Sequence, residues 1–422
     1  MATVESSPVT GRDIEAARPA VASTARRTPV LSTRTISERA GGTVALKAEN
    51  LQRTGSFKVR GTGAKLAALG VKGCAAGVVA ASAGNHAQAL AAAARTMGVP
   101  CEVFVPADAP IAKTEAARGQ GAIVHLGGAS VDECLIAAKE RAREGGLAFI
   151  HPFDDPDIVA GQGTLGLELL EEVPDLAKVV VPVGGGGLCS GIAIAVKSAR
   201  PDVEVVGVQV AACAPYVESL KRGEIVEATA SITIADGIAV KKPGELTMPL
   251  LAQWVDSVVA VGEDETAEAM VLLMERCKLV VEGAGAVGVA ALLGGHVAPA
   301  ENGTTVAVLS GGNVDPGLLA SIARRHETEA GRRLVLLTRV PDRPGALAAL
   351  LACVAEAGGN VVDVSHMREG FDLHVRETAV ELVLETRGRE HADRVMEAMR
   401  PRVSGAGAGV APDLTPASPT LY

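Results

Sequence analysis

The segment Glu49-Asn50-Leu51-Gln52-Arg53-Thr54-Gly55-Ser56-Phe57-Lys58-Val59-Arg60-Gly61 contains the lysine on which the fold assignment of this chain depends. A lone lysine after a phenylalanine is usually a solvated surface residue, so Lys58 by itself indicates no chemistry. Three segments further along the chain change that interpretation.

Two of these segments place free backbone N–H groups where a helix begins. Ser82-Ala83-Gly84-Asn85-His86 leads from an apolar run into an Ala-rich helical pattern, and four glycines, 184–187, follow the apolar run 178–183. Such junctions attract carboxylates and phosphates. A simple helix cap explains the first segment equally well. Four glycines after a buried strand instead favour a phosphate site, and no Lys-Ser or Lys-Thr follows as in a P-loop.

The third segment is Ser310-Gly311-Gly312-Asn313, which follows the apolar run 305–309. A hydroxyl at the carboxyl end of a strand lies where ligands bind in open α/β sheets. Taken alone, this motif fits a turn as well as a binding site.

In order and spacing, the four motifs resemble those of fold-type II pyridoxal-phosphate enzymes, most closely the threonine dehydratases (threonine ammonia-lyases) and serine racemases. The likeness covers residues 10–325. It implies that Lys58 forms a Schiff base with pyridoxal 5′-phosphate, that Phe57 lies against the cofactor ring and that Asn85 bonds the 3′-oxygen. The implied contacts of the phosphate are Gly184, Gly185, Gly186, Gly187 and Leu188, and Ser310 is the implied partner of the pyridine nitrogen. The implied contacts of the substrate carboxylate are Ser82, Ala83, Gly84, Asn85 and His86, and Glu282 falls near the site.

The resemblance also implies an activity: L-threonine and L-serine lose water by β-elimination, and the aminoacrylate-type product hydrolyses to ammonia and 2-oxobutanoate or pyruvate. The cofactor would act as the electron sink and Lys58 as the base. Serine racemases carry a proton-donating serine where this chain has Ala83, so elimination is favoured over racemisation. A serine racemase/serine dehydratase and a non-catalytic amino-acid sensor remain as alternatives.

No divalent metal site is predicted. The segment that supplies an acidic pair to the metal of serine racemases has Gln209 and Pro215 here, and hard divalent cations prefer carboxylate oxygens. A monovalent cation stays open.

Alternating apolar runs and helical patterns predict an α/β fold with parallel sheets that are covered on both faces. Strands are expected at 43–48, 77–81, 102–105, 122–126, 178–183, 204–210 and 305–309. Helices are expected at 86–97, 111–119, 130–143, 187–199, 264–275 and 316–326. The resemblance assigns 1–326 to a catalytic domain of two open parallel-sheet lobes, with a small lobe, about 53–155, inserted in the large one.

The pattern changes after residue 326. A strand at 333–340, a helix at 346–357, strands at 360–366 and 377–384 and a helix at 389–399 are expected. This βαββα order predicts a ferredoxin-like domain over 330–402, and the composition of 403–422 predicts a disordered tail.

The segment 337–347 resembles the start of an ACT domain, a regulatory module that commonly pairs side by side and binds amino acids. Asp342, Arg343 and Gly345 are therefore candidate effector contacts, with isoleucine as the first candidate effector and valine as the second. A domain that only joins subunits is the alternative.

Composition excludes several classes of protein. A net charge of −9 and 2% aromatic residues do not fit a nucleic-acid binder. Seven scattered cysteines without a CxxC pair indicate a reducing compartment. The first 18 residues do not resemble a secretory signal, and no apolar run approaches the roughly 20 residues of a membrane span. We expect a cytoplasmic homodimer or homotetramer.

Overall fold

The computed structural model divides into two compact units, Met1–Asp315 and Pro316–Tyr422, and each is described by itself. The structure describes residues 7–82, 84–109, 111–229, 232–368 and 373–403. The predicted substrate contact Ala83 lies outside these residues, as does the predicted tail from residue 404 onward. The second unit begins at Pro316, ahead of the predicted boundary at 326–330.

The larger sheet of the first unit has six strands in the order β1-β2-β10-β7-β8-β9. Only β1 runs antiparallel to its neighbour, and the other pairs are parallel. The strands are β1 Val30–Ser32, β2 Val44–Lys47, β7 Leu176–Pro182, β8 Glu204–Val210, β9 Ser257–Val261 and β10 Thr304–Val308. All five residues of β10 are buried, because a central strand of such a sheet is covered on both faces.

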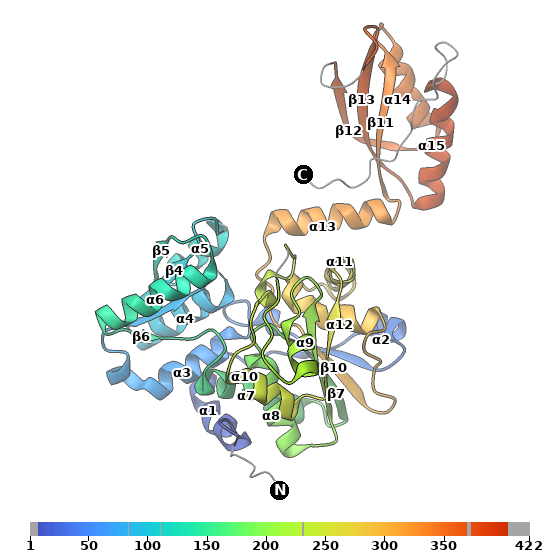
Figure 1. Cartoon of the computed structure of the whole chain (residues 1–422). Coiled ribbons are helices and arrows are strands. Elements are labelled where there is room, and N and C mark those ends of the chain that lie inside the picture. The colour runs from blue at the N-terminus through green and yellow to red at the C-terminus, as the bar shows by residue number, and fades with distance from the viewer. Residues whose placement is uncertain (1–6, 83, 110, 230–231, 369–372, 404–422) are drawn as a thin grey trace. The chain divides into compact units, whose positions relative to one another are not determined.

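The smaller sheet has four parallel strands in the order β5-β4-β3-β6. They are β3 Val78–Ala81, β4 Cys101–Val105, β5 Ile123–Leu126 and β6 Ala148–Phe149. In Figure 1 this lobe, coloured blue to cyan, lies beside the green and yellow elements of the larger lobe.

Helices connect and cover the strands of both sheets. Those of the first unit are α1 Gly11–Thr24, α2 Arg34–Ala40, α3 Lys58–Gly73, α4 Asn85–Met97, α5 Ile111–Gly119, α6 Val131–Gly145, α7 Pro156–Glu172, α8 Gly187–Ala199, α9 Pro215–Arg222, α10 Thr247–Trp254, α11 Glu263–Leu272 and α12 Gly283–Leu293. Short helices are the 3₁₀ turns η1 Glu49–Leu51 and η2 Asp236–Ile238 and the π-helix η3 Leu273–Cys277.

This topology brings three of the sequence motifs to the carboxyl ends of parallel strands. Ser82 follows β3, the four glycines follow β7 by one residue, and Ser310 follows β10 by one residue. Because β7 and β10 are neighbours in register, the glycines and Ser310 meet at one edge of the larger sheet.

The second unit has the element order α-β-α-β-β-α: α13 Pro316–Glu329, β11 Arg333–Pro341, α14 Ala346–Glu356, β12 Asn360–Met367, β13 Glu377–Glu385 and α15 Arg389–Val403. Its antiparallel sheet has the order β11-β13-β12. Every second residue of β11 is buried, so one face of the sheet is covered. That face packs against α14 and α15 in a core that contains Leu336, Val354 and Val395.

All predicted strands and helices are present, with ends that differ by a few residues. Several others were not predicted, among them α3, α7 and α12 and the strands β1, β6 and β9. Among the described residues, none of the helices is both long and apolar enough to cross a membrane.

Candidate active site

Lys58 is the first residue of α3, and its amine faces a site formed by both lobes of the first unit. Its Nζ donates a hydrogen bond to the carbonyl oxygen of Pro152 at 2.9 Å. Burial of the amine lowers the pKa of Lys58 to about 8, although the negative charge of Glu282 opposes this shift. The amine is therefore much closer to its neutral, nucleophilic form than an ordinary lysine.

Ser310 and Lys58 are brought together by pairing between their backbones. The N–H of Phe57 donates to the carbonyl oxygen of Ser310 at 3.1 Å, and Ser56 forms an isolated bridge with Gly311. The Ser310 hydroxyl is buried and has one long contact of 3.5 Å, to the carbonyl oxygen of Ala284. Because this contact is long, the hydroxyl hydrogen can turn to a better acceptor.

The glycine loop, Gly184–Gly187, lies between β7 and α8. Within the described part of the chain, the backbone N–H groups of Gly184, Gly185 and Gly186 have no hydrogen-bond partner. Gly186 has a φ of +89°, a backbone conformation that residues other than glycine rarely adopt. Free N–H groups at the start of a helix form an anion site.

The chain around the glycine loop fixes its shape. A Cβ on Gly185 would lie 2.1 Å from the ring of Phe153, so the loop can take no side chain there. The carbonyl oxygen of Gly185 accepts hydrogen bonds from the hydroxyls of Tyr216 and Thr247, each at 2.8 Å. Thr247 in turn is held by Asp154, whose carboxylate accepts its backbone N–H at 3.0 Å. The free N–H groups therefore have a fixed direction.

The described residues of the segment 82–86 form the start of α4. The Ser82 hydroxyl accepts the N–H of Gly84 at 3.2 Å, and the helix begins at Asn85. His86 is buried, and its Nε2–H donates to the carbonyl oxygen of Ile150 at 3.1 Å, so Nδ1 carries the lone pair. Burial lowers the pKa of His86 to about 3, which keeps the ring neutral.

Asn85 is linked to both sides of the site. Its Nδ2 donates to Oε1 of Glu282 at 2.6 Å, and its Oδ1 accepts from Nδ2 of Asn313 at 2.7 Å. One N–H of Asn85 remains for a further acceptor. Burial, and then the charge of Asp236, raise the pKa of Glu282 to about 7.

Sequence reasoning did not find the residues that shape the site from outside the motifs. Tyr216, Thr247, Phe153 and Asp154 support the glycine loop, and Pro152 contacts the amine, but none belongs to a pattern with a chemical meaning. Asn313 belongs to the segment 310–313, but the motif assigns it no role. Only the fold brings these residues together.

The arrangement fits pyridoxal phosphate. A lysine of lowered pKa would bind its aldehyde, the free N–H groups of the glycine loop its phosphate, and the Ser310 hydroxyl its pyridine nitrogen. Buried side-chain atoms without a hydrogen-bond partner also lie around the site, including His86 Nδ1 and Ser56 Oγ. Among the described residues, no group of three His, Cys, Asp or Glu side chains could hold a metal ion.

Comparison with known proteins gives the class of this site. Residues 21–311 match the pyridoxal-phosphate dependent enzyme family, and the chain belongs to that family. It is 44% identical to the L-threonine ammonia-lyase of Thermotoga maritima over 387 residues, which cover 92% of this chain and 96% of that protein.

Two solved structures are similar to the first unit. A threonine deaminase, that of T.th., superposes with a TM-score of 0.68 at 42% identity, over 72% of this chain and 98% of its own. The serine racemase of maize superposes with a TM-score of 0.72 at 33% identity, over 76% of this chain and 99% of its own. Both likenesses support the prediction of a fold-type II pyridoxal-phosphate enzyme.

Proposed function

We propose that this chain is an L-threonine ammonia-lyase that also accepts L-serine. The observation that carries the proposal is Lys58, a buried lysine of lowered pKa whose amine bonds the carbonyl oxygen of Pro152, next to Phe153, whose ring lies against the glycine loop. The relative from Thermotoga maritima, similar along nearly its whole length, supports threonine as the substrate.

The geometry supports the proposed cofactor contacts. Lys58 would bind the aldehyde carbon, the glycine loop and Leu188 would bind the phosphate, and the Ser310 hydroxyl would donate a hydrogen bond to the pyridine nitrogen. The remaining N–H of Asn85 is the donor for the 3′-oxygen. Phe57, whose ring centroid lies 5.2 Å from Lys58 Nζ, would lie against the cofactor ring.

The substrate carboxylate is proposed to bind the N-terminus of α4, which begins after Ser82 and Gly84. Among the described residues, the backbone N–H groups of Asn85 and His86 have no hydrogen-bond partner there. Ala83 belongs to the same predicted set. Because His86 is neutral, this end of the site holds the carboxylate through hydrogen bonds and not through an imidazolium charge.

Bound pyridoxal phosphate supplies an electron sink for the pair released from Cα. Lys58 would be the amine that removes the Cα proton, since its lowered pKa keeps part of it neutral near physiological pH. Ser310, unlike a carboxylate, does not hold a proton on the pyridine nitrogen, which favours expulsion of the β-hydroxyl. The products are 2-oxobutanoate from threonine, or pyruvate from serine, and ammonia.

Serine racemisation is the second candidate, since the maize racemase has a similar structure. Racemisation requires a proton donor on the face of the substrate opposite Lys58. The side chain of Ala83 has no transferable proton, which favours elimination.

We assign the second unit to an ACT-like regulatory domain. Its turn after β11 supports this proposal, because Gly345 caps α14 with a φ of +86°. The N–H of Ala346 donates to the carbonyl oxygen of Arg343 at 3.2 Å, whereas those of Leu347 and Ala348 have no partner among the described residues and could bind a ligand. Asp342 and Arg343 flank that turn. Nη2 of Arg368 donates a hydrogen bond to Oδ1 of Asp342 at 3.0 Å. Isoleucine is the first candidate effector and valine the second. A cytoplasmic homodimer or homotetramer completes the proposal.

The test is an assay of ammonia and 2-oxo acid from L-threonine and L-serine, with and without isoleucine and with chiral detection of D-serine. We expect 2-oxobutanoate and ammonia in equal amounts, no D-serine and a change of rate with isoleucine. D-serine formed as fast as pyruvate would contradict the role given to Ala83, and indifference to both isoleucine and valine would contradict the regulatory role.

A further inference from the structure

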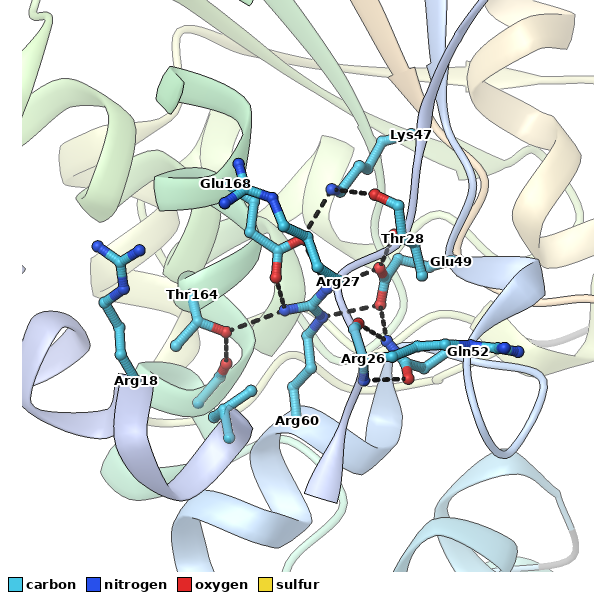
Figure 2. Close-up of polar contacts among 12 residues, drawn as sticks. Arg18, Arg26, Arg27, Thr28, Lys47, Glu49, Gln52, Arg60, Thr164 and Glu168 are labelled. Atoms are coloured by element: carbon cyan, nitrogen blue, oxygen red, sulfur yellow. Dashed lines mark hydrogen bonds and ion pairs between the residues drawn. The ribbon is translucent and has the colours of Figure 1, made fainter. Parts of the chain in front are cut away.

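A cluster of charged side chains surrounds Arg60 (Figure 2), which lies in the first turn of α3, two residues after Lys58. We call it the Arg60 cluster; its members are Lys47, Glu49, Arg60, Thr164 and Glu168. Lys47, Glu49 and Arg60 are at most 1% exposed, and the side chain of Glu168 is 13% exposed. None of these residues belongs to the binding site described above.

The guanidinium of Arg60 uses all five of its N–H groups within this cluster. Nε and Nη2 donate to the two oxygens of Glu49, each at 2.8 Å. Nη1 and Nη2 donate to the two oxygens of Glu168 at 2.7 and 3.0 Å. The fifth N–H, on Nη1, reaches the Thr164 hydroxyl at 3.3 Å. Two bidentate pairs fix the guanidinium plane as well as its position.

The carboxylate of Glu49 is held as an anion. The Arg60 charge, its hydrogen bonds and the Thr28 hydroxyl keep the pKa of Glu49 below its usual value despite burial. Lys47 adds a second positive charge, 2.7 Å from Glu168. A buried ion cluster is a poor way to stabilise a fold, since apolar side chains of similar volume often do as well. The property that apolar packing would not reproduce is a fixed geometry.

That geometry is imposed on the start of α3. Arg60 is two residues after Lys58, and the helix start has no side-chain cap of its own. Glu49 begins η1, on the other side of the loop that leads to Lys58. Arg60 therefore ties the two ends of this loop to each other and, through Glu168, to α7.

The opposite side of the loop is held by the end of β10. The N–H of Gly312 donates to the carbonyl oxygen of Gly55 at 2.9 Å, and Asn313 Nδ2 donates to that of Thr54 at 2.8 Å. Helix α3 also packs closely on α7, because a Cβ on Gly161 would lie 2.7 Å from the Cα of Gly61. Rotation of α3 is thus resisted at its first turn from two directions.

We propose that Arg60 is a positioning residue, which through Glu49 and Glu168 fixes the direction in which Lys58 presents its amine to the cofactor aldehyde and the substrate Cα. The inference rests on the proposed function for its catalytic consequence alone. The placement of the Lys58 amine is a property of the chain itself and can be measured without turnover.

The test compares Arg60→Lys, which keeps the charge but cannot form two bidentate pairs, with Lys178→Met as a matched control. Lys178 is also a buried ion-paired lysine, bonded to Glu204 at 3.0 Å and to the carbonyl oxygen of Ala298 at 2.7 Å on the larger sheet. We expect Arg60→Lys to lower both kcat for L-threonine and the rate of Schiff-base formation by the apoenzyme at least about tenfold. KM should change less than about twofold, since Arg60 touches no substrate.

Lys178→Met should lower Tm while leaving kcat and the rate of Schiff-base formation within about twofold of the parent protein. Equal rates in Arg60→Lys and the parent protein, with only Tm lowered, would show that the cluster is structural and overturn the proposal. If Arg60→Lys does not fold, Glu168→Gln, which leaves the Glu49 pair intact, must still lower both rates at least about threefold, and parental rates would refute the proposal. Absence of threonine turnover in the parent protein would remove the proposed function, whereas the Schiff-base rates would still decide the role of Arg60.

Discussion

The pKa of the Lys58 amine predicts how fast the apoenzyme captures its cofactor at each pH. Only the neutral amine attacks an aldehyde, so the rate should follow the neutral fraction. Burial lowers the pKa of Lys58 from 10.5 to about 8. At pH 8 the neutral fraction is therefore about one half, against roughly 0.3% for an ordinary lysine, an advantage of roughly 150-fold.

The rate of Schiff-base formation, followed by visible absorbance, should rise from pH 6.5, pass its midpoint near pH 8 and level off above pH 9. Dividing each rate by the rate of the neutral form of Nα-acetyl-lysine amide at the same pH, calculated from that amine's own pKa, removes the titration of the cofactor itself. Glu282→Gln should move the midpoint lower, because the negative charge of Glu282 raises the pKa of Lys58. A rate that still rises steeply at pH 10 would refute the argument, since it would mean that the amine is solvated like an ordinary lysine.

Three further predictions concern the glycine loop and the second unit. Gly185→Ala should weaken cofactor binding by about 1–3 kcal/mol, roughly five- to a hundredfold in Kd, because the new methyl meets the ring of Phe153 at 2.1 Å. Equilibrium dialysis measures it, and Gly119→Ala, which meets no atom within 4 Å, is the control. Tyr216→Phe removes one of two hydroxyls that bond Gly185 and should weaken cofactor binding by about 1 kcal/mol, with unchanged affinity counting against the role of this bond. Leu336→Ala, at a site with no exposed surface, should lower the free energy of unfolding in urea by about 2–5 kcal/mol, and a change under about 1 kcal/mol would contradict its burial.

Most strands and many helices could be predicted because their sequences carry a clear period or an uninterrupted apolar run. The strand β7 reads as a buried strand from Val179-Val180-Val181 alone. Helix α7 was missed, because it is buried on nearly all faces and has no polar stripe to reveal its period. The sequence of helix α12 is entirely apolar and rich in glycine and other small residues, so it resembles that of a loop or a strand as much as that of a helix.

The site divides in the same way. Lys58, the glycine loop and Ser310 could be named because each motif has a local chemical meaning at a chain junction. The residues that orient them could not, because their roles arise from distant contacts. Tyr216 and Thr247 reach Gly185 from 31 and 62 residues away, and Glu168 reaches Arg60 from 108 residues away. No local pattern records such a pairing.

The protonation state of Glu282 could be predicted neither from its motif nor from the resemblance. Its position was expected near the site from the resemblance, but its state depends on burial and on the neighbouring charge of Asp236, which raise its pKa to about 7. Burial depends on the packing of both lobes, so the sequence alone could not predict this protonation.

The proposed β-elimination requires Lys58 as its base and as the residue that binds the cofactor. The decisive measurement is the yield of 2-oxobutanoate and ammonia from L-threonine by the cofactor-supplemented protein and by its Lys58→Ala variant. We predict equal amounts of the two products from the parent protein and loss of both, together with the Schiff-base absorbance, in the folded variant. Full activity in Lys58→Ala, or no product from the parent protein, would contradict the account.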